Sequence, residues 1–178
     1  MTTHPRTDLG TVDDLHRSAA RVTGLDDFGG GDGYRDGLRV LLDSYAREAA
    51  LTPAGSKRTR GLLRGALVSR LLAEAAWRQH PEHARVPVPR PVFVTGLPRT
   101  GTTALHRVLT ADPAHQGPEL WLTEVPQPRP PRATWPDHPV YLALQEAYRG
   151  AGLDGVHPMA PAQVEECWRL LCQSMTSV

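Results

Sequence analysis

The sequence has little excess charge of either sign and almost no lysine. Its net charge is +1, with 20 Lys and Arg residues against 19 Asp and Glu residues. Bulk electrostatics therefore gives no reason to expect binding to nucleic acid or to an anionic membrane surface. Lys57 is the one lysine, so arginine carries nearly all of the positive charge. Any anion must be bound by a local arrangement of groups.

Cysteines and long apolar runs are also scarce. Cys167 and Cys172 are too few for a disulfide framework or a zinc site, and we expect both to be buried free thiols. The sequence has no run of ~18 apolar residues that would span a bilayer, and its first ten residues contain no apolar segment typical of a secretion signal. These absences predict a soluble, cytoplasmic protein with no membrane partner.

The composition is that of a folded, largely helical protein. Hydrophobic residues form 40% of the chain and charged residues 22%, proportions typical of globular domains. Apolar residues recur at helical spacing through residues 1–90, which predicts an N-terminal helical region. Residues 92–95 are the one convincing strand, a β-branched and aromatic run typical of a buried parallel strand. Further helices are predicted over residues 102–111, 140–149 and 162–178.

The predicted strand leads into a glycine turn and a helix start, in the segment GLPRTGTT of residues 96–103. The first amides of a helix have no internal partner and carry partial positive charge, so this order of elements forms an anion site. Gly96 and Gly101 let the backbone curl and bring its amides close to a ligand. Thr102 and Thr103 add hydroxyl donors where the helix begins.

This loop differs from a nucleotide-triphosphate loop at one position. The pattern G-x-x-x-x-G-K-[ST] requires a lysine where this chain has Thr102. Arg99 lies inside the turn instead, and its planar guanidinium can hold two anion oxygens at once. A dinucleotide site is excluded, because G-x-G-x-x-G requires a glycine where this chain has Pro98.

The segment FVTGLPRTGTTALHRVL resembles the 5′-phosphosulfate-binding loop of bacterial sulfotransferases, in its P-R-[ST]-G-T-T form. The likeness continues through GPELW, a proline-rich segment and HPMAPAQVEECWRLL, and covers residues 91–171. It implies an α/β, P-loop-like sulfotransferase fold, 3′-phosphoadenosine 5′-phosphosulfate as the donor, a small-molecule alcohol, phenol or amine as the acceptor, and no metal. The residues that it implies for binding the donor are Gly96, Pro98, Arg99, Thr100, Gly101, Thr102 and Thr103.

The resemblance also implies groups that assist the transfer. Arg99 would stabilise the phosphate oxygen that leaves, and a base would take the proton of the acceptor. Glu119 in GPELW is the nearest counterpart of a glutamate base used by related enzymes, and Glu124 is the second candidate. A further cluster near the acceptor pocket comprises His157, Glu165 and Glu166.

Several parts of the family's pattern are missing from the chain. A parallel sheet needs several strands and one is predicted, and the family's 3′-phosphate site and C-terminal glycine-rich basic segment are absent. We therefore expect an incomplete, mostly α-helical fold in which residues 91–178 are the N-terminal part of a sulfotransferase domain without useful activity alone. Two other classes stay open, a P-loop nucleotide kinase-like protein and a non-catalytic helical interaction protein with a vestigial loop. The sequence carries no indication of the oligomeric state.

Overall fold

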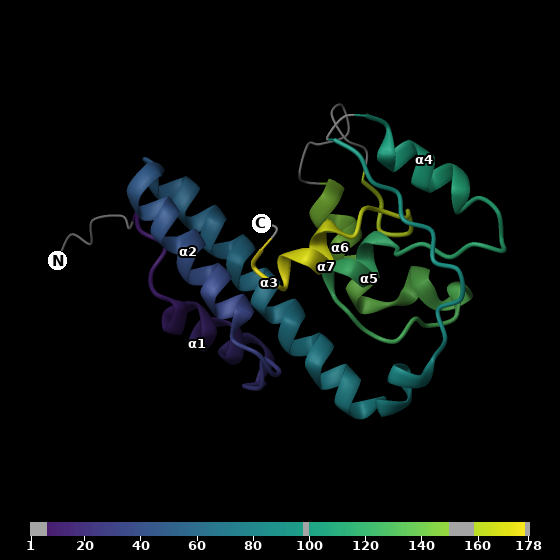
Figure 1. The fold of residues 1–178 in the computed structure, drawn as a ribbon, viewed down its shortest axis with the longest axis horizontal. Helices are drawn as coiled ribbons and strands as arrows, with labels where there is room; N and C mark the ends of the chain where they lie inside the picture. The colour runs from purple at the N-terminus through teal and green to yellow at the C-terminus, as the bar shows by residue number, and fades with distance from the viewer. Residues whose placement is uncertain (1–6, 98–99, 150–158, 177–178) are drawn as a thin grey trace. The chain divides into compact units, whose positions relative to one another are not determined.

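The structure is a computed structural model that describes residues 7–97, 100–149 and 159–176. Within these ranges it contains seven α-helices, two 3-10 helices and an isolated β-bridge, but no β-strand. The chain divides into two compact units, residues 1–79 with 168–178 and residues 80–167 (Figure 1). No helix of the described ranges is both long enough and apolar enough to cross a bilayer.

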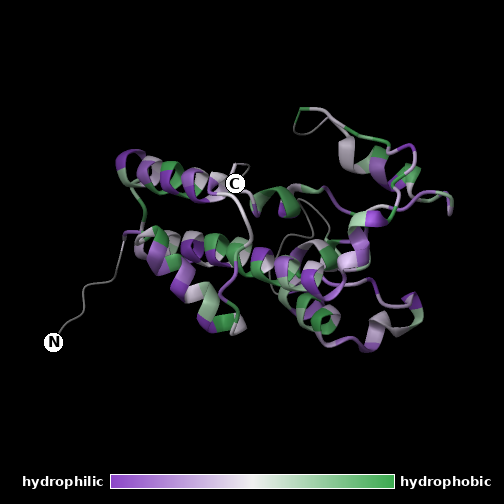
Figure 2. Ribbon diagram, turned by 60° about the horizontal axis from the view of Figure 1, so that its bottom comes forward, coloured by the Kyte–Doolittle hydropathy of each residue, from purple (hydrophilic) through white to green (hydrophobic). Residues whose placement is uncertain are grey.

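Three helices, α1 (Val12–Thr23), α2 (Gly33–Glu48) and α3 (Pro53–Gln79), form most of the first unit. α1 packs against both α2 and α3. Apolar and polar residues alternate around each of these helices, as amphipathic packing requires (Figure 2). The helical character predicted for this part of the chain is confirmed. The most deeply buried leucines of its core are Leu15, Leu38, Leu63, Leu67 and Leu71.

The first helix begins and ends at the residues that its sequence favours. Thr11 Oγ1 accepts a hydrogen bond from Asp14 N at 3.1 Å, and Asp14 Oδ2 accepts one from Thr11 N at 3.0 Å, which completes a capping box. The hydrogen bond from the Thr11 backbone also lowers the pKa of the Asp14 carboxyl. The helix ends at Gly24, whose φ of 71° lies in the left-handed region that favours glycine.

The end of the chain returns to this helical unit. α7 (Trp168–Cys172) is followed by Met175, which is 3% exposed and joins the leucine core. A Cβ at Gly37 would lie 2.7 Å from the carbonyl oxygen of Met175, so a glycine is required there. Arg70 donates to the carbonyl of Gln173 at 3.4 Å. These contacts join a late segment of the chain to its N-terminal helices.

The helix predicted over residues 162–178 is much shorter than expected. It is restricted to α7, because residues 161–165 exchange backbone hydrogen bonds with residues 118–121 instead of continuing a helix. Cys172 is buried as predicted, but Cys167 is exposed, which corrects the expectation of two buried thiols.

An aromatic cluster joins three of the helices in the second unit. The unit contains η1 (Pro81–Arg85), α4 (Thr102–Leu109), α5 (Leu120–Glu124), η2 (Arg132–Asp137) and α6 (Pro139–Arg149). Trp121 of α5 is fully buried, and its ring centroid lies 5.5 Å from that of Trp135, 4.9 Å from that of His138 and 5.7 Å from that of Tyr141. The cluster therefore joins α5, η2 and α6.

Residues 92–95 do not form the predicted buried strand. They have no regular secondary structure, and Phe93 is 82% exposed. A strand is stable only when its N–H and C=O groups pair with a neighbouring strand, and the described residues contain no strand that pairs with this segment. The prediction was wrong because the pattern identifies a strand-forming segment but does not supply its partner.

Candidate functional site

The glycine turn before α4 has the tight geometry that its sequence predicts. Gly101 is the N-cap of α4 and has a φ of 94°. A Cβ at Gly96 would lie 2.8 Å from Thr100 Oγ1 and 2.9 Å from Thr102 Cγ2, so no side chain fits there. Thr100 Oγ1 donates to the carbonyl of Leu97 at 2.6 Å. The turn is therefore closed by its own contacts on both sides of Pro98 and Arg99, two predicted site residues that lie outside the described residues.

The hydroxyls of the first two residues of α4 converge on a single oxygen. Thr103 Oγ1 donates to Glu166 Oε1 at 2.7 Å, and Thr102 Oγ1 donates to the same oxygen at 3.2 Å. The Glu166 side chain is exposed, whereas both threonines are partly buried. A carboxylate of the chain thus lies at the helix N-terminus that the sequence predicts to hold an anion.

The backbone beside Glu166 is fixed by its hydrogen bonds to the start of α5. Glu165 N donates to the carbonyl of Pro118 at 2.9 Å, and Leu120 N donates to the carbonyl of Gln163 at 2.9 Å. Glu119 and Val164 form the isolated antiparallel bridge between these two segments. The bridge therefore fixes the position of the Glu166 backbone relative to the start of α5.

The neighbouring carboxylate, Glu165, ties this segment to α4. Glu165 is buried and its Oε2 lies 3.5 Å from Arg107 Nη2 of α4. Gly117 provides the close approach that the segment needs, since a Cβ there would lie 2.6 Å from His106 Nε2 and 3.0 Å from Val164 Cγ1. Glu165 thus helps to hold the segment against α4 through its ion pair with Arg107. Glu166, the next residue, accepts hydrogen bonds from the threonine hydroxyls.

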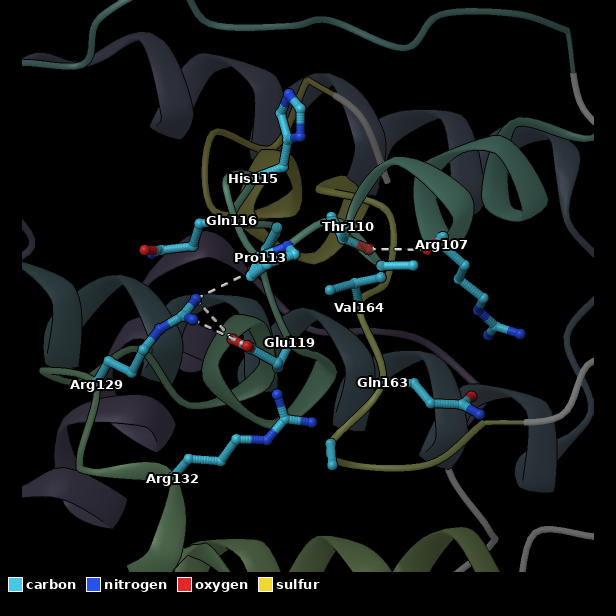
Figure 3. Close-up of a pocket in the computed structure, with 13 residues that line it drawn as sticks. Arg107, Thr110, Pro113, His115, Gln116, Glu119, Arg129, Arg132, Gln163 and Val164 are labelled. Carbon is cyan, nitrogen blue, oxygen red and sulfur yellow. Dashed lines mark hydrogen bonds and ion pairs between the residues drawn. The ribbon is translucent and has the colours of Figure 1, made fainter.

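Glu119, the first predicted base, is held in a two-point ion pair. Arg129 Nη1 donates to Glu119 Oε1 at 2.9 Å, and Arg129 Nη2 lies 2.7 Å from Glu119 Oε2 (Figure 3). Arg129 Nη2 also donates to the carbonyl of Gly117 at 3.0 Å. The pair lies in a cleft of about 570 Å³ that Arg107 and Arg132 also line. Both oxygens of the Glu119 carboxylate therefore face one guanidinium.

The remaining predicted carboxylate and histidine lie elsewhere. Glu124 Oε1 accepts a hydrogen bond from Tyr148 Oη of α6 at 2.6 Å. His157 lies outside the described residues. Of the predicted carboxylates, Glu166 is the one whose hydrogen bonds run to Thr102 and Thr103. Within the described parts of the chain, no three His, Cys, Asp or Glu side chains gather where they would hold a metal ion.

Sequence reasoning did not identify Arg129 as a partner of Glu119. Arg129 lies in the proline-rich connector before η2, in a chain where arginine provides nearly all the positive charge. Because arginines are so frequent in this chain, the sequence does not distinguish Arg129 from the others as a site residue. Only the folded connector brings the guanidinium to the Glu119 carboxylate.

Comparisons with known proteins identify the family that this fold resembles. Residues 91–178 match the Sulfotransferase family. The crystal structure of sulfotransferase STF1 from Mycobacterium tuberculosis H37Rv (type1 form) is similar with a TM-score of 0.88 and 56% sequence identity, over 96% of this chain and 48% of that chain. The crystal structure of sulfotransferase STF9 from Mycobacterium avium is similar with a TM-score of 0.78 and 31% identity, over 93% of this chain and 44% of that chain. No curated protein sequence gives a significant match.

Residues 91–178 belong to the sulfotransferase family, and the chain matches part of the P-loop-like fold of these enzymes. The resemblance read from the loop is thereby confirmed. The chain spans about half the length of the two sulfotransferase structures that it matches.

Proposed function

We propose that this chain carries the donor-binding loop of a sulfotransferase that transfers a sulfuryl group from 3′-phosphoadenosine 5′-phosphosulfate to a hydroxyl or amine of a small-molecule acceptor. The observation that carries the proposal is the pair of hydroxyls, on Thr102 and Thr103, that converge on one anionic oxygen at the start of α4. The family match over residues 91–178 supports the choice of reaction.

The chemistry of the transfer suits such a loop. The acceptor oxygen or nitrogen forms a bond to sulfur while the bond from sulfur to the bridging phosphate oxygen breaks, which leaves adenosine 3′,5′-bisphosphate. Negative charge grows on the phosphate oxygen that leaves, so donors placed there in advance lower the barrier. The amides at the start of α4 and the hydroxyls of Thr102 and Thr103 would supply such donors, and we expect Arg99 of the same turn to add a cation. We propose that Gly96, Pro98, Thr100 and Gly101 shape the turn.

We propose Glu166 as the base that takes the acceptor's proton. The position of Glu166 supports this proposal, since its carboxylate accepts hydrogen bonds from the loop hydroxyls that would hold the donor. The two bases first predicted from the sequence have less support, because both oxygens of Glu119 face Arg129 and Glu124 binds the Tyr148 hydroxyl. A base must lie within hydrogen-bond reach of the proton that it takes, which favours the carboxylate beside the donor site.

Calorimetric titration with adenosine 3′,5′-bisphosphate tests the proposed donor site. We expect the 178-residue chain to bind this nucleotide in preference to ATP with magnesium. Replacing Thr103 by valine keeps the shape of the side chain and removes one hydroxyl, so affinity should fall about tenfold. Thr134→Val is the matched control, because Thr134 lies in η2, outside the loop, and its hydroxyl donates to the carbonyl of Pro131 just before that helix.

Two results would contradict the proposal. A preference for ATP with magnesium would favour a kinase-like nucleotide site. Equal affinities of the Thr103→Val and Thr134→Val variants would mean that the start of α4 does not hold the nucleotide, as expected of a helical interaction protein with a vestigial loop.

A further inference from the structure

We propose that Glu166 is a gate on the donor site, which its carboxylate occupies until the donor displaces it. This inference rests on the proposed function, because it assumes that Thr102 and Thr103 bind the donor. The observation behind it is that both threonine hydroxyls are already donated to Glu166 Oε1, at 3.2 and 2.7 Å.

The hydroxyl protons cannot serve two acceptors at once. A threonine hydroxyl has one proton to donate, and the protons of Thr102 and Thr103 both point to Glu166. A phosphosulfate oxygen that arrives at the start of α4 must take these hydrogen bonds from the carboxylate. The two negative groups would also repel each other at this distance. Donor binding and the observed position of the Glu166 carboxylate therefore exclude one another.

The gate can open by movement of a single side chain. Glu166 is exposed, so its side chain can rotate into water without disturbing packed neighbours. The preceding residue is fixed, because Glu165 is buried, lies 3.5 Å from Arg107 and donates its N–H to Pro118 O. The backbone thus keeps Glu166 beside the loop whether its carboxylate is bound or released.

This arrangement couples the two substrates in a fixed order. While Glu166 accepts hydrogen bonds from Thr102 and Thr103, Oε1 is engaged and less available to an acceptor's proton. When the donor takes those hydrogen bonds, the carboxylate is released at the edge of the donor site and can accept the proton as the acceptor attacks sulfur. The gate therefore predicts that the donor binds first and that its arrival frees the base.

The affinity for adenosine 3′,5′-bisphosphate tests the gate, because removal of the carboxylate should tighten binding. We expect Glu166→Ala to bind about tenfold more tightly than the unchanged chain, and Glu166→Gln to lie between the two, since a neutral amide oxygen is a weaker competitor for the hydroxyls. Glu146→Ala is the matched control, because Glu146 is an exposed carboxylate of the same unit whose ion pair is with Arg149. A merely structural role for Glu166 would give weaker binding, the opposite sign.

A second measurement follows the carboxylate itself. The carboxyl carbon resonance of Glu166 should shift when the nucleotide is added, and that of Glu146 should stay in place. Unchanged or weaker binding by both Glu166 variants would overturn the gate and leave the proposed donor site intact. An absence of nucleotide binding by the unchanged chain and by every variant would overturn the donor site, and the gate with it.

Discussion

Removal of Arg129 should destabilise the second unit by leaving the Glu119 carboxylate buried without its counter-charge. Loss of one partner of a buried ion pair costs about 3–5 kcal/mol. The Arg129 side chain is 34% exposed and that of Glu119 is 9% exposed, so water partly solvates the remaining carboxylate and we expect a loss of about 2 kcal/mol in the free energy of unfolding for Arg129→Met. Methionine retains most of the aliphatic length of arginine, which limits the loss of packing.

Urea unfolding of the whole chain measures this loss, in a background in which Trp77 and Trp168 of the first unit are replaced by phenylalanine, so that the fluorescence of Trp121 and Trp135 reports on the second unit. Arg149→Met is the control, since its ion pair with Glu146 is exposed and should contribute about 0.5 kcal/mol or less. Adding Glu119→Gln to Arg129→Met removes the buried charge and should restore much of the stability. If Arg129→Met cost no more than Arg149→Met, or if the second change restored nothing, the structural role of this ion pair would be refuted.

Two further predictions concern the helical unit. Thr11→Ala removes the hydroxyl that caps α1 and should lower the free energy of unfolding by about 1 kcal/mol, measured by urea unfolding, whereas Thr11→Ser should retain the cap and most of the stability. His16 lies between Val12 O and the Tyr34 hydroxyl, and burial lowers the pKa of its ring. The unfolded ring therefore binds its proton at a higher pH than the folded ring, so this contribution to stability is complete above the ordinary histidine pKa of about 6.5 and is lost as the pH falls below it. Thermal unfolding from pH 7.5 down to pH 5 should show a steeper loss for the unchanged chain than for His16→Gln, and equal slopes would contradict the assignment.

Local signals were sufficient to predict most of the helices. Thr11 and Asp14 mark the start of α1, and the apolar spacing of α2 and α3 reports directly on the face that each helix buries. A helix satisfies its backbone hydrogen bonds within one segment, so its sequence carries most of the information needed to place it. The segment 92–95 has an equally clear pattern, yet a strand depends on a partner elsewhere, and the pattern alone does not reveal whether one is present.

The site likewise has a part that the sequence predicts and a part that it does not. Gly96, Gly101 and the two threonines are consecutive parts of one motif, and their geometry agrees with the expectation of a tight turn at a helix start. The resemblance points to Glu119 as the base, because Glu119 lies in the segment after the loop helix where related enzymes carry a glutamate. Glu166 lies beside the loop because of two contacts of its neighbours. Val164 forms a bridge with Glu119, and Glu165 forms an ion pair with Arg107 of α4. No periodicity or spacing in the sequence encodes that pairing.

The burial of Met175 in the helical unit has a consequence for the order in which the chain folds. The helices that receive Met175 end at residue 79, and the segment carrying it resumes at residue 168, so residues 80–167 form a closed loop between them. Closing an unfolded loop of that length costs about 4 kcal/mol of chain entropy, more than the roughly 1.5–3 kcal/mol gained by burying one methionine side chain. This entropy cost falls once residues 80–167 have folded, because their two ends are then held at a fixed distance from each other. The segment that carries Met175 should therefore dock late, after the second unit has folded, although the helices that it completes are synthesised before the second unit.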